Sequence, residues 1–553
     1  MARTFSDEKF QEGLYFLPLG GTEDIGMNMN LYGYKGQWIM VDCGISFHQG
    51  LGIEIIMADP SFIVERAKSL AGIIVTHAHE DHVGAIPYLW RELKAPVYTT
   101  KFTGEILRHK LEEVALAKEV PLNIIGLDQK VQIGPFEVEF VSLTHSIPEP
   151  SALMISTPVG KIFHTGDWKI DANPLIGDKI DEERLKKLGD EGILAMVCDS
   201  TNVMNEGESG SEGVVRDHLI DLIAQHKGKG RLAVACFASN VARVQSIAEA
   251  AQKSGRKCSL VGRSMHRMVE SAKECGYLKG IPPFIKDSEA ADLPKNQVLY
   301  ICTGSQGEPR SALKRISEGT HPIIDLEQGD TVIYSSRMIP GNEKVIGAVQ
   351  NALAKKRIEV ITAQDAFIHV SGHPARGELE RMYSWIRPKI AIPVHGEPRH
   401  LFEHEKLAKS CGVKNVILPH DGALIDLLAS KPGIVSKVPA GRLGIDGDTL
   451  IDMDNGILKA RQSISTKGCA FVTIHYVGKK HHTLKVALVG ITEEGVLEEE
   501  MIDDITLSLN PILREITPNY TDGEIEEKVR SGVRKTIASI KGVKPKIIVH
   551  VIR

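Results

Sequence analysis

The spacing of apolar positions changes along the chain. Between residues 14 and 165 the apolar runs are short, rich in β-branched and aromatic residues, and bounded by Gly, Pro or Asp, as in LYFLPL, QWIMVD and FEVEFVSLT. This pattern predicts many short strands and few helices. From about residue 193 to 362, apolar runs such as ILAMVCD, RLAVACF and QVLYICT alternate with longer helical stretches. Such regular alternation predicts a parallel sheet with crossover helices.

The pattern changes again in the last third of the chain. Residues 363–425 return to shorter units, with IAIPVH as a buried strand. Gly, Pro and Lys then crowd together in ASKPGIVSKVPAGRLGIDGD, which predicts a break between domains. Beyond it, TIHYVG, LKVALVG and KIIVHVI are typical of strands, and DGEIEEKVRSGVRKTIASI is typical of an amphipathic helix. Because 553 residues are too many for one ordinary core, several domains are expected.

The strongest chemical signal is the run HAHEDH, which follows the predicted strand GIIVT. It packs His77, His79, Asp81 and His82 into six positions. We expect the first two side chains to project to one side of the turn onto one ion, and the last two to project to the other side onto a neighbouring ion. Neutral imidazole and carboxylate are favoured ligands of Zn²⁺, with Mn²⁺ as the alternative. A polar surface loop is the other interpretation, but three histidines this close together at a strand end favour a metal site.

Two later residues at strand ends extend this set. His145 in VSLTHSIPEP is a candidate third ligand of the first metal, and Asp167 in IFHTGDWK is a candidate carboxylate bridge between two ions. Asp42, which ends WIMVD, is a candidate to orient a ligating imidazole. We expect His164 to be a packed histidine, and the spacing of Asp24 excludes it as a ligand.

Together these motifs resemble those of the metallo-β-lactamase fold, a four-layer αββα sandwich. That fold alone leaves lactams, thioesters, lactones and phosphodiesters open as substrates. The later runs CDST, HVSGH and IPVHGE match three further motifs of the β-CASP nucleases, a subgroup with a nucleic-acid-binding insert. The resemblance extends to the ribonuclease J family, over about residues 14–425. It is carried by the runs ACFASNVARVQ, GRSM, TGSQGEP and SSRMIPGNE.

The resemblance implies a role for each motif residue. The first metal is implied to lie on His77, His79 and His145, and the second on Asp81, His82, Asp167 and His395. His373 is implied to donate a proton to the departing 3′-oxygen, with Asp199 oriented against it. Asp81, His373 and Asp199 are therefore the expected catalytic residues. The implied cofactors are two Zn²⁺ ions per chain, or Mn²⁺ in their place, which would ionise a water beside the phosphate.

The inserted segment offers many polar groups where its predicted strands end. In a parallel sheet ligands sit at the carboxyl edge of the strands, and here that edge carries hydroxyls, amides, glycine backbone and two guanidinia. Such groups suit phosphate and sugar oxygens, whereas a lactam or thioester pocket would be mostly apolar. The residues expected to contact RNA or phosphate are Ser239, Asn240, Arg263, Arg337, Asn342, His369, Ser371 and His373.

The expected fold class is thus α/β. It combines a metallo-β-lactamase αββα sandwich, an inserted parallel-sheet β-CASP domain and a small α+β C-terminal domain. The predicted boundaries are 1–205 and 366–430 for the two parts of the sandwich, 206–365 for the insert, 431–445 for a linker and 446–553 for the C-terminal domain.

Composition narrows the expected partners and location. The net charge is −5, which argues against a diffuse nucleic-acid binder and leaves room for a local basic groove. The eight cysteines are scattered without a CxxC pair, as in reduced cytoplasmic proteins, and no apolar run is long enough to span a membrane. The terminal domain, by its resemblance, implies a homodimer or tetramer.

The function that follows from the resemblance is metal-dependent hydrolysis of single-stranded RNA. It implies 5′→3′ exonuclease and endonuclease cleavage, 5′-phosphate and 3′-hydroxyl ends, a preference for 5′-monophosphorylated RNA, and a place in the maturation and decay of ribosomal and messenger RNA. Three alternatives remain: a small-molecule lactamase or lactonase, a DNA-repair nuclease of the same subgroup, and a binding scaffold that has lost catalysis.

Overall fold

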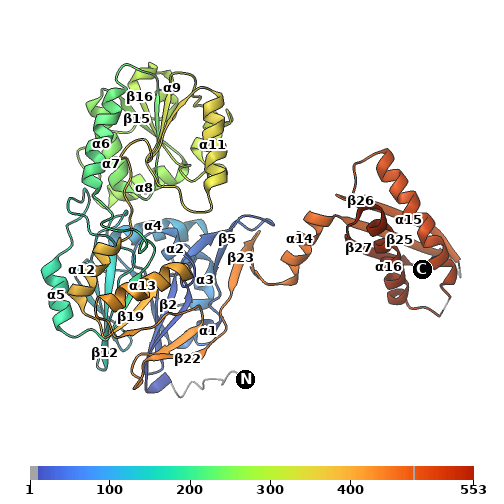
Figure 1. Cartoon of the computed structure of the whole chain (residues 1–553), viewed down its shortest axis with the longest axis horizontal. Coiled ribbons are helices and arrows are strands. Elements are labelled where there is room, and N and C mark those ends of the chain that lie inside the picture. The colour runs from blue at the N-terminus through green and yellow to red at the C-terminus, as the bar shows by residue number, and fades with distance from the viewer. Residues whose placement is uncertain (1–9, 478–479, 518) are drawn as a thin grey trace. The chain divides into compact units, whose positions relative to one another are not determined.

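The computed structural model describes residues 10–477, 480–517 and 519–553 (Figure 1). It divides into two compact units. The first comprises Met1–Ser46 and Ile56–Gly441, and the second comprises Phe47–Ile55 and Arg442–Arg553. Within the described residues, none of the helices combines the length and the apolar character that crossing a bilayer requires.

Two sheets form the centre of the first unit. One has the strand order β22-β21-β1-β2-β3-β6-β7-β8, and the other has the order β20-β19-β13-β12-β11-β10-β9. The strands of the first sheet are β1 (Leu14–Gly20), β2 (Met29–Tyr34), β3 (Gln37–Val41), β6 (Leu70–Ile74), β7 (Val97–Thr99), β8 (Leu122–Ile124), β21 (Ala423–Asp426) and β22 (Gly433–Lys437). Those of the second are β9 (Lys130–Ile133), β10 (Phe136–Ser142), β11 (Ser151–Thr157), β12 (Gly160–His164), β13 (Ala195–Asp199), β19 (Ile390–Val394) and β20 (Asn415–Val416).

The two sheets pack face to face through alternate apolar side chains. Phe16, Tyr32 and Ile74 of the first sheet share one buried cluster with Phe140 and Ile392 of the second. Because alternate side chains of a strand point to opposite faces, every second residue of these strands enters the core. This shared cluster joins the two sheets into the middle layers of a sandwich.

Helices cover the outer faces of both sheets. The second sheet packs its other face against α5 (Glu182–Asp190), α12 (Arg376–Ile386) and α13 (Pro398–Ser410), through residues such as Met196, Leu379 and Leu407. On the first sheet, the ring of Phe62 in α1 (Ser61–Val64) lies 5.4 Å from that of Trp38 in β3. The predicted four-layer αββα sandwich is confirmed.

The inserted segment forms a separate parallel sheet. Its strands are β14 (Leu232–Ala235), β15 (Lys257–Val261), β16 (Val298–Cys302), β17 (Thr331–Tyr334) and β18 (Glu359–Ile361), in the order β15-β16-β14-β17-β18 with every pair parallel. The connecting helices include α6 (Glu212–Gln225), α7 (Val241–Lys253), α8 (Arg263–Glu274) and α11 (Glu343–Lys355). The predicted parallel sheet is confirmed, while its predicted boundaries at residues 205 and 365 stay predictions.

The second unit contains the small α+β fold that the sequence predicts. Its strand β25 (Cys469–Val477) pairs antiparallel with β26 (Lys480–Val489) and parallel with β27 (Lys546–Ile552). Helices α15 (Val496–Glu515) and α16 (Asp522–Lys541) pack on this sheet through a shared apolar cluster. The amphipathic helix expected from DGEIEEKVRSGVRKTIASI is α16, which begins at a capping box formed by Thr521 and Glu524.

Candidate metal centre

Strand direction brings the candidate ligands to one edge of the sandwich. In the second sheet β12, β13 and β19 are parallel, and β10 runs the same way because β11 is antiparallel to both β10 and β12. The carboxyl ends of these four strands therefore meet at one edge. His145 follows β10, Asp167 follows β12, Asp199 ends β13 and His395 follows β19. In the facing sheet, the HAHEDH turn follows β6.

The first group of donors consists of three imidazoles and one carboxylate. Nδ1 of His79 lies 3.0 Å from Nε2 of His77 and 3.1 Å from Nε2 of His145. Oδ2 of Asp167 lies 3.8 Å from Nε2 of His77 and 3.9 Å from Nε2 of His145. Four donor atoms thus surround one point.

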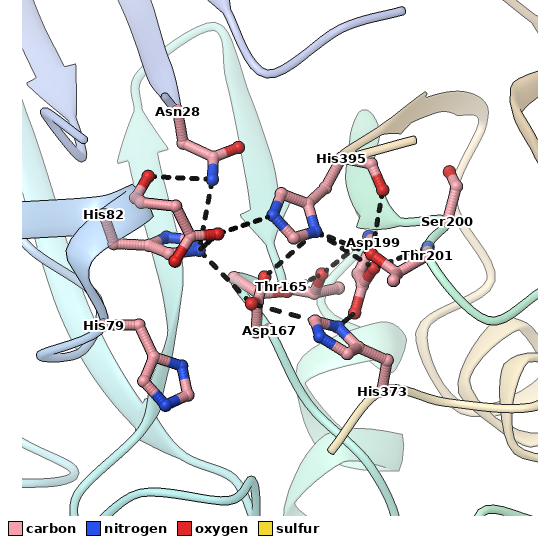
Figure 2. Close-up of polar contacts among 12 residues, drawn as sticks. Asn28, His79, His82, Thr165, Asp167, Asp199, Ser200, Thr201, His373 and His395 are labelled. Atoms are coloured by element: carbon pink, nitrogen blue, oxygen red, sulfur yellow. Dashed lines mark hydrogen bonds and ion pairs between the residues drawn. The ribbon is translucent and has the colours of Figure 1, made fainter. Parts of the chain in front are cut away.

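The second group shares the Asp167 carboxylate with the first. Oδ2 of Asp167 lies 3.2 Å from Nε2 of His82, which in turn lies 3.5 Å from Oδ2 of Asp81. That Asp81 oxygen lies 3.1 Å from Nε2 of His395. The same oxygen of Asp167 therefore faces both groups, and Figure 2 shows His82, Asp167 and His395 turned toward one another.

These spacings fit metal coordination. Zn²⁺ binds imidazole nitrogen at about 2.0–2.1 Å, so donors at the corners of a tetrahedron stand about 3.3 Å apart. Within each group all donor atoms lie within 4.8 Å of one another. Burial lowers the pKa of His77 and His145 well below its usual value and that of His79 to about 4, so these imidazoles are neutral and able to bind a cation. The donor atoms of both groups suit divalent ions, and so does the neutral state of the three imidazoles in the first group. Against the effect of burial, the nearby carboxylates raise the pKa of His82 and His395 in the second group above its ordinary value, so a cation bound there would take the place of their protons.

The carboxylates give the centre a surplus of negative charge. Burial alone would raise the pKa of Asp81 and Asp167, but the surrounding histidines hold both pKa values well below the usual range. Asp42 and Asp199 add two further buried carboxylates close by. Buried charges need a partner, and bound cations would neutralise these.

A hydrogen bond to the other ring nitrogen holds most of these imidazoles in place. Nδ1 of His82 lies 2.7 Å from Oδ2 of Asp42, as expected for a carboxylate that orients a ligand. Nδ1 of His395 lies 2.7 Å from Oγ1 of Thr201. The structure thereby adds Thr201, whose position beside the CDST aspartate was its only signal in the sequence.

Main-chain and turn contacts contribute two more partners that the sequence did not reveal. Nδ1 of His145 lies 2.5 Å from the carbonyl oxygen of Gly372, and Nδ1 of His77 lies 3.0 Å from Oγ1 of Thr76. A backbone carbonyl has no side-chain signature, so no motif marks Gly372 as a partner. His164, by contrast, is buried with Nδ1 2.8 Å from the Tyr32 hydroxyl, as expected of a packed histidine.

A histidine–carboxylate pair lies beside the second group. Nδ1 of His373 is 2.8 Å from Oδ2 of Asp199, and it is also 3.8 Å from Oδ2 of Asp167. Burial lowers the pKa of His373, but the Asp199 and Asp167 carboxylates outweigh it and raise the pKa above its ordinary value. Figure 2 shows this imidazole between Asp199 and Asp167. The pair is arranged to keep a proton on the ring.

Part of the expected RNA-binding set lines a cavity of about 570 Å³. Arg337, His369 and Ser371 lie on its wall together with Ser305 and Tyr334. Nδ1 of His369, Oγ of Ser305 and the Tyr334 hydroxyl are buried and have no hydrogen-bond partner within the described part of the chain. Buried polar atoms are rarely left unpaired, which makes this wall suitable for a polar ligand.

The other expected RNA-binding residues lie elsewhere. Oγ of Ser239 is 3.1 Å from Nε2 of His79, so it contacts a metal-ligand candidate. Asn240 caps α7 and donates to Glu212, and Asn342 lies 3.4 Å from Gln306. Arg263 is exposed at the first position of α8. Within the part of the chain that the structure describes, none of these four side chains lies on the cavity wall.

Three family models match successive segments of the chain. They are "Beta-lactamase superfamily domain" over residues 37–185, "Ribonuclease J, beta-CASP domain" over 229–353 and "Zn-dependent metallo-hydrolase RNA specificity domain" over 357–419. The ribonuclease J of Sinorhizobium meliloti is 39% identical over 100% of this chain and 99% of its own length. The chain belongs to the ribonuclease J family.

Further members of this family match to a similar extent. The ribonuclease J of Mycolicibacterium smegmatis is 38% identical over 98% of this chain and 97% of its own, and that of Mycobacterium tuberculosis is 36% identical over 96% and 93%. A solved structure of a protein of unknown function from Enterococcus faecalis is 18% identical, with a TM-score of 0.52, and covers 75% of this chain and 100% of its own. That likeness shows the fold alone. Family membership and the clustered donors together support a metal-binding hydrolase of the ribonuclease class.

The contact between Asp42 and His82 predicts a change in metal affinity. The Asp42→Asn variant keeps the size of the side chain but removes the charge that supports the His82 imidazole. We expect Zn²⁺ affinity to fall about 10- to 100-fold, measured by competition with a chromophoric chelator. Asp448→Asn, which removes an exposed carboxylate, serves as the control. An unchanged affinity in Asp42→Asn would contradict the assigned role.

Proposed function

We propose that this ribonuclease J family chain hydrolyses phosphodiester bonds in single-stranded RNA at a pair of divalent ions, either Zn²⁺ or Mn²⁺. The observation that carries the proposal is the pair of four-atom donor groups that share Oδ2 of Asp167. His77, His79 and His145 would hold one ion, and Asp81, His82 and His395 the other. Bound divalent ions lower the pKa of water and neutralise charge on the attacked phosphate.

His373 supplies the proton for the leaving group in this proposal. Its Nδ1 faces Asp199, which leaves Nε2 as the atom that can donate to the departing 3′-oxygen. The His373 side chain is 22% exposed, whereas those of His77, His82, His145 and His395 are at most 4% exposed. A substrate can therefore reach His373. Cleavage in which the 3′-oxygen leaves and takes up this proton produces a 3′-hydroxyl end and a 5′-phosphate end.

The cavity beside the metal centre would hold the end of the RNA. Ser371 lies two residues before His373 and lines the cavity with Arg337, so the wall combines a cation with hydroxyl donors. Such groups bind phosphate. A phosphate held at a fixed distance from the ions would favour 5′-monophosphorylated RNA and release of single nucleotides in the 5′→3′ direction, beside endonuclease cleavage at internal sites.

The proposal extends to the setting in which the enzyme works. We place it in the cytoplasm because its eight cysteines are all free thiols. Its family membership supports a role in the maturation and decay of ribosomal and messenger RNA. We also propose a homodimer or tetramer. Val496, Leu497 and Leu507 of α15 are 52–71% exposed, and burying these apolar side chains between two copies of the chain would favour association.

Removing the His373 imidazole tests its proposed role as a proton donor. We expect His373→Ala to lower kcat for RNA about 10²- to 10⁴-fold while the chain still binds two ions per molecule. Single-turnover cleavage of an end-labelled RNA measures the rate, and elemental analysis measures the metal. The exposed residue His266 offers a control variant, His266→Ala, that should cleave at the wild-type rate. A His373→Ala enzyme of undiminished kcat would refute this role.

Arg337 tests the proposed phosphate pocket. We expect Arg337→Ala to weaken the preference for 5′-monophosphate over 5′-triphosphate RNA more than it weakens internal cleavage, because it removes a cation from the cavity wall. The measurement compares one RNA sequence with either 5′ end, labelled at each end in turn. Arg357→Ala, which removes an exposed arginine after α11, is the control. Equal losses of exonuclease and endonuclease activity would rule out the pocket.

A further inference from the structure

The two groups of metal-ligand candidates differ in where their outer partners come from. In the second group, His82 contacts Asp42 and His395 contacts Thr201, and both partners belong to the sandwich. In the first group, His79 uses Nδ1 toward the other donors and presents Nε2 to Ser239, which lies between β14 and α7 of the inserted domain. The insert therefore contacts a ligand candidate of the first group directly.

His145 contacts the segment that follows the insert. Its Nδ1 lies 2.5 Å from the carbonyl oxygen of Gly372, in the segment by which the chain returns from β18 to the sandwich. The approach is so close that a Cβ atom added at Gly372 would lie 2.8 Å from Cε1 of His145. Two of the three imidazoles in the first group are thus held by segments that flank or belong to the insert.

The buried side chain of Arg243 connects the segment that carries Ser239 with the segment that carries Gly372. Arg243 in α7 is fully buried, and its guanidinium donates to the carbonyl oxygen of Ile368 at 3.0 Å and to the carbonyl oxygen of Ser335 at 2.8 Å. Ile368 lies four residues before Gly372. Arg243 therefore fixes the start of the returning segment against the end of β17.

Glu212, the ion-pair partner of Arg243, fixes the segment that carries Ser239. Glu212 accepts from Nη2 of Arg243 at 2.8 Å and from Nε at 3.1 Å, and it also accepts from the Asn240 side chain at 3.2 Å. Asn240 is the neighbour of Ser239. Its Oδ1 accepts from the Arg243 backbone N–H at 2.9 Å, which closes the turn that presents Ser239 to His79.

A second ion pair ties Glu212 to the chain beyond Asp167. The backbone N–H of Glu212 donates to Asp171 at 2.9 Å, and Asp171 pairs with the buried Lys169 at 3.2 Å. Lys169 is two residues after Asp167. Breaking a buried pair leaves an uncompensated charge, so this network resists separation of the insert from the sandwich.

We propose that Arg243 and Glu212 are positioning residues for the first metal-binding group. They hold Ser239 and Gly372 where these residues fix the His79 and His145 rings, so that the affinity of this group for its ion depends on the placement of the inserted domain. The imidazoles of the second group, His82 and His395, have their outer partners in the sandwich and do not share this dependence. The inference rests on the proposed two-metal function.

Zinc binding by the full-length protein tests the proposal. The variants are Arg243→Met and Ser239→Ala, and each is compared with the wild-type chain. Each is also made in a His395→Ala background, which removes a ligand of the second group, so that titration with Zn²⁺ measures binding to the first group. We expect both variants to weaken Zn²⁺ binding to the first group about 10- to 100-fold and to change binding to the second group less than two-fold. Thermal unfolding of the same samples measures stability.

Matched controls separate positioning from general destabilisation. Arg256 is another buried arginine of the insert, with its guanidinium bound to the carbonyl oxygens of Gly230, Val298 and His226. Ser246 in α7 donates its hydroxyl to the carbonyl oxygen of Ala242. Arg256→Met and Ser246→Ala should leave Zn²⁺ binding to both groups unchanged, even where Arg256→Met lowers Tm as much as Arg243→Met does.

The outcomes distinguish the inference from the function on which it rests. If the wild-type chain binds no pair of ions, the proposed function fails. If it binds two and Ser239→Ala keeps wild-type affinity at the first group, or if Arg243→Met weakens both groups equally, the inference alone is overturned. Selective loss at the first group in both variants supports it.

Discussion

The candidate active site depends on the buried carboxylate of Asp167, which lies beside both groups of candidate metal ligands. Oδ2 of Asp167 lies within 3.2–3.9 Å of Nε2 in His82, His77 and His145. An isolated charge in such surroundings is unfavourable, so the carboxylate requires cationic neighbours. Four strands that run in one direction bring Asp167 and the surrounding histidines to one edge of the sandwich. The sandwich thus holds a buried carboxylate among imidazole nitrogens, which is a donor arrangement that suits divalent cations.

The inserted domain does more than add surface for a substrate. Its loops reach the metal centre through Ser239, and the segment that returns from it carries Gly372, Ser371 and His373. The same segment lines the cavity proposed for the RNA end. The candidate metal ligands, the proposed proton donor and the proposed phosphate pocket therefore lie at the junction between the sandwich and the insert. A net charge of −5 argues against binding RNA over a broad basic surface and is compatible with binding at a local site such as this one.

The sequence predicted the parts of this site that short motifs encode. HAHEDH places four donors in six positions, the ends of two later strands added His145 and Asp167, and family resemblance added His395. The fold brings all of these residues together. The contact of Ser239 with His79 and the role of Arg243 were not predictable, because they join residues 125–160 positions apart through tertiary packing. The carbonyl of Gly372 was not predictable either, since a backbone atom leaves no mark on residue type. Asn240, a predicted phosphate ligand, caps α7 with its side chain, a contact that its position before a helix could have indicated.

Anomalous X-ray scattering at the zinc edge, from crystals of the full chain grown with Zn²⁺, tests the central claim most directly. The account predicts two peaks about 3.5–4 Å apart, with a carboxylate oxygen of Asp167 within coordination distance of both. A single peak, or two peaks that leave Asp167 outside the coordination of either ion, would contradict it.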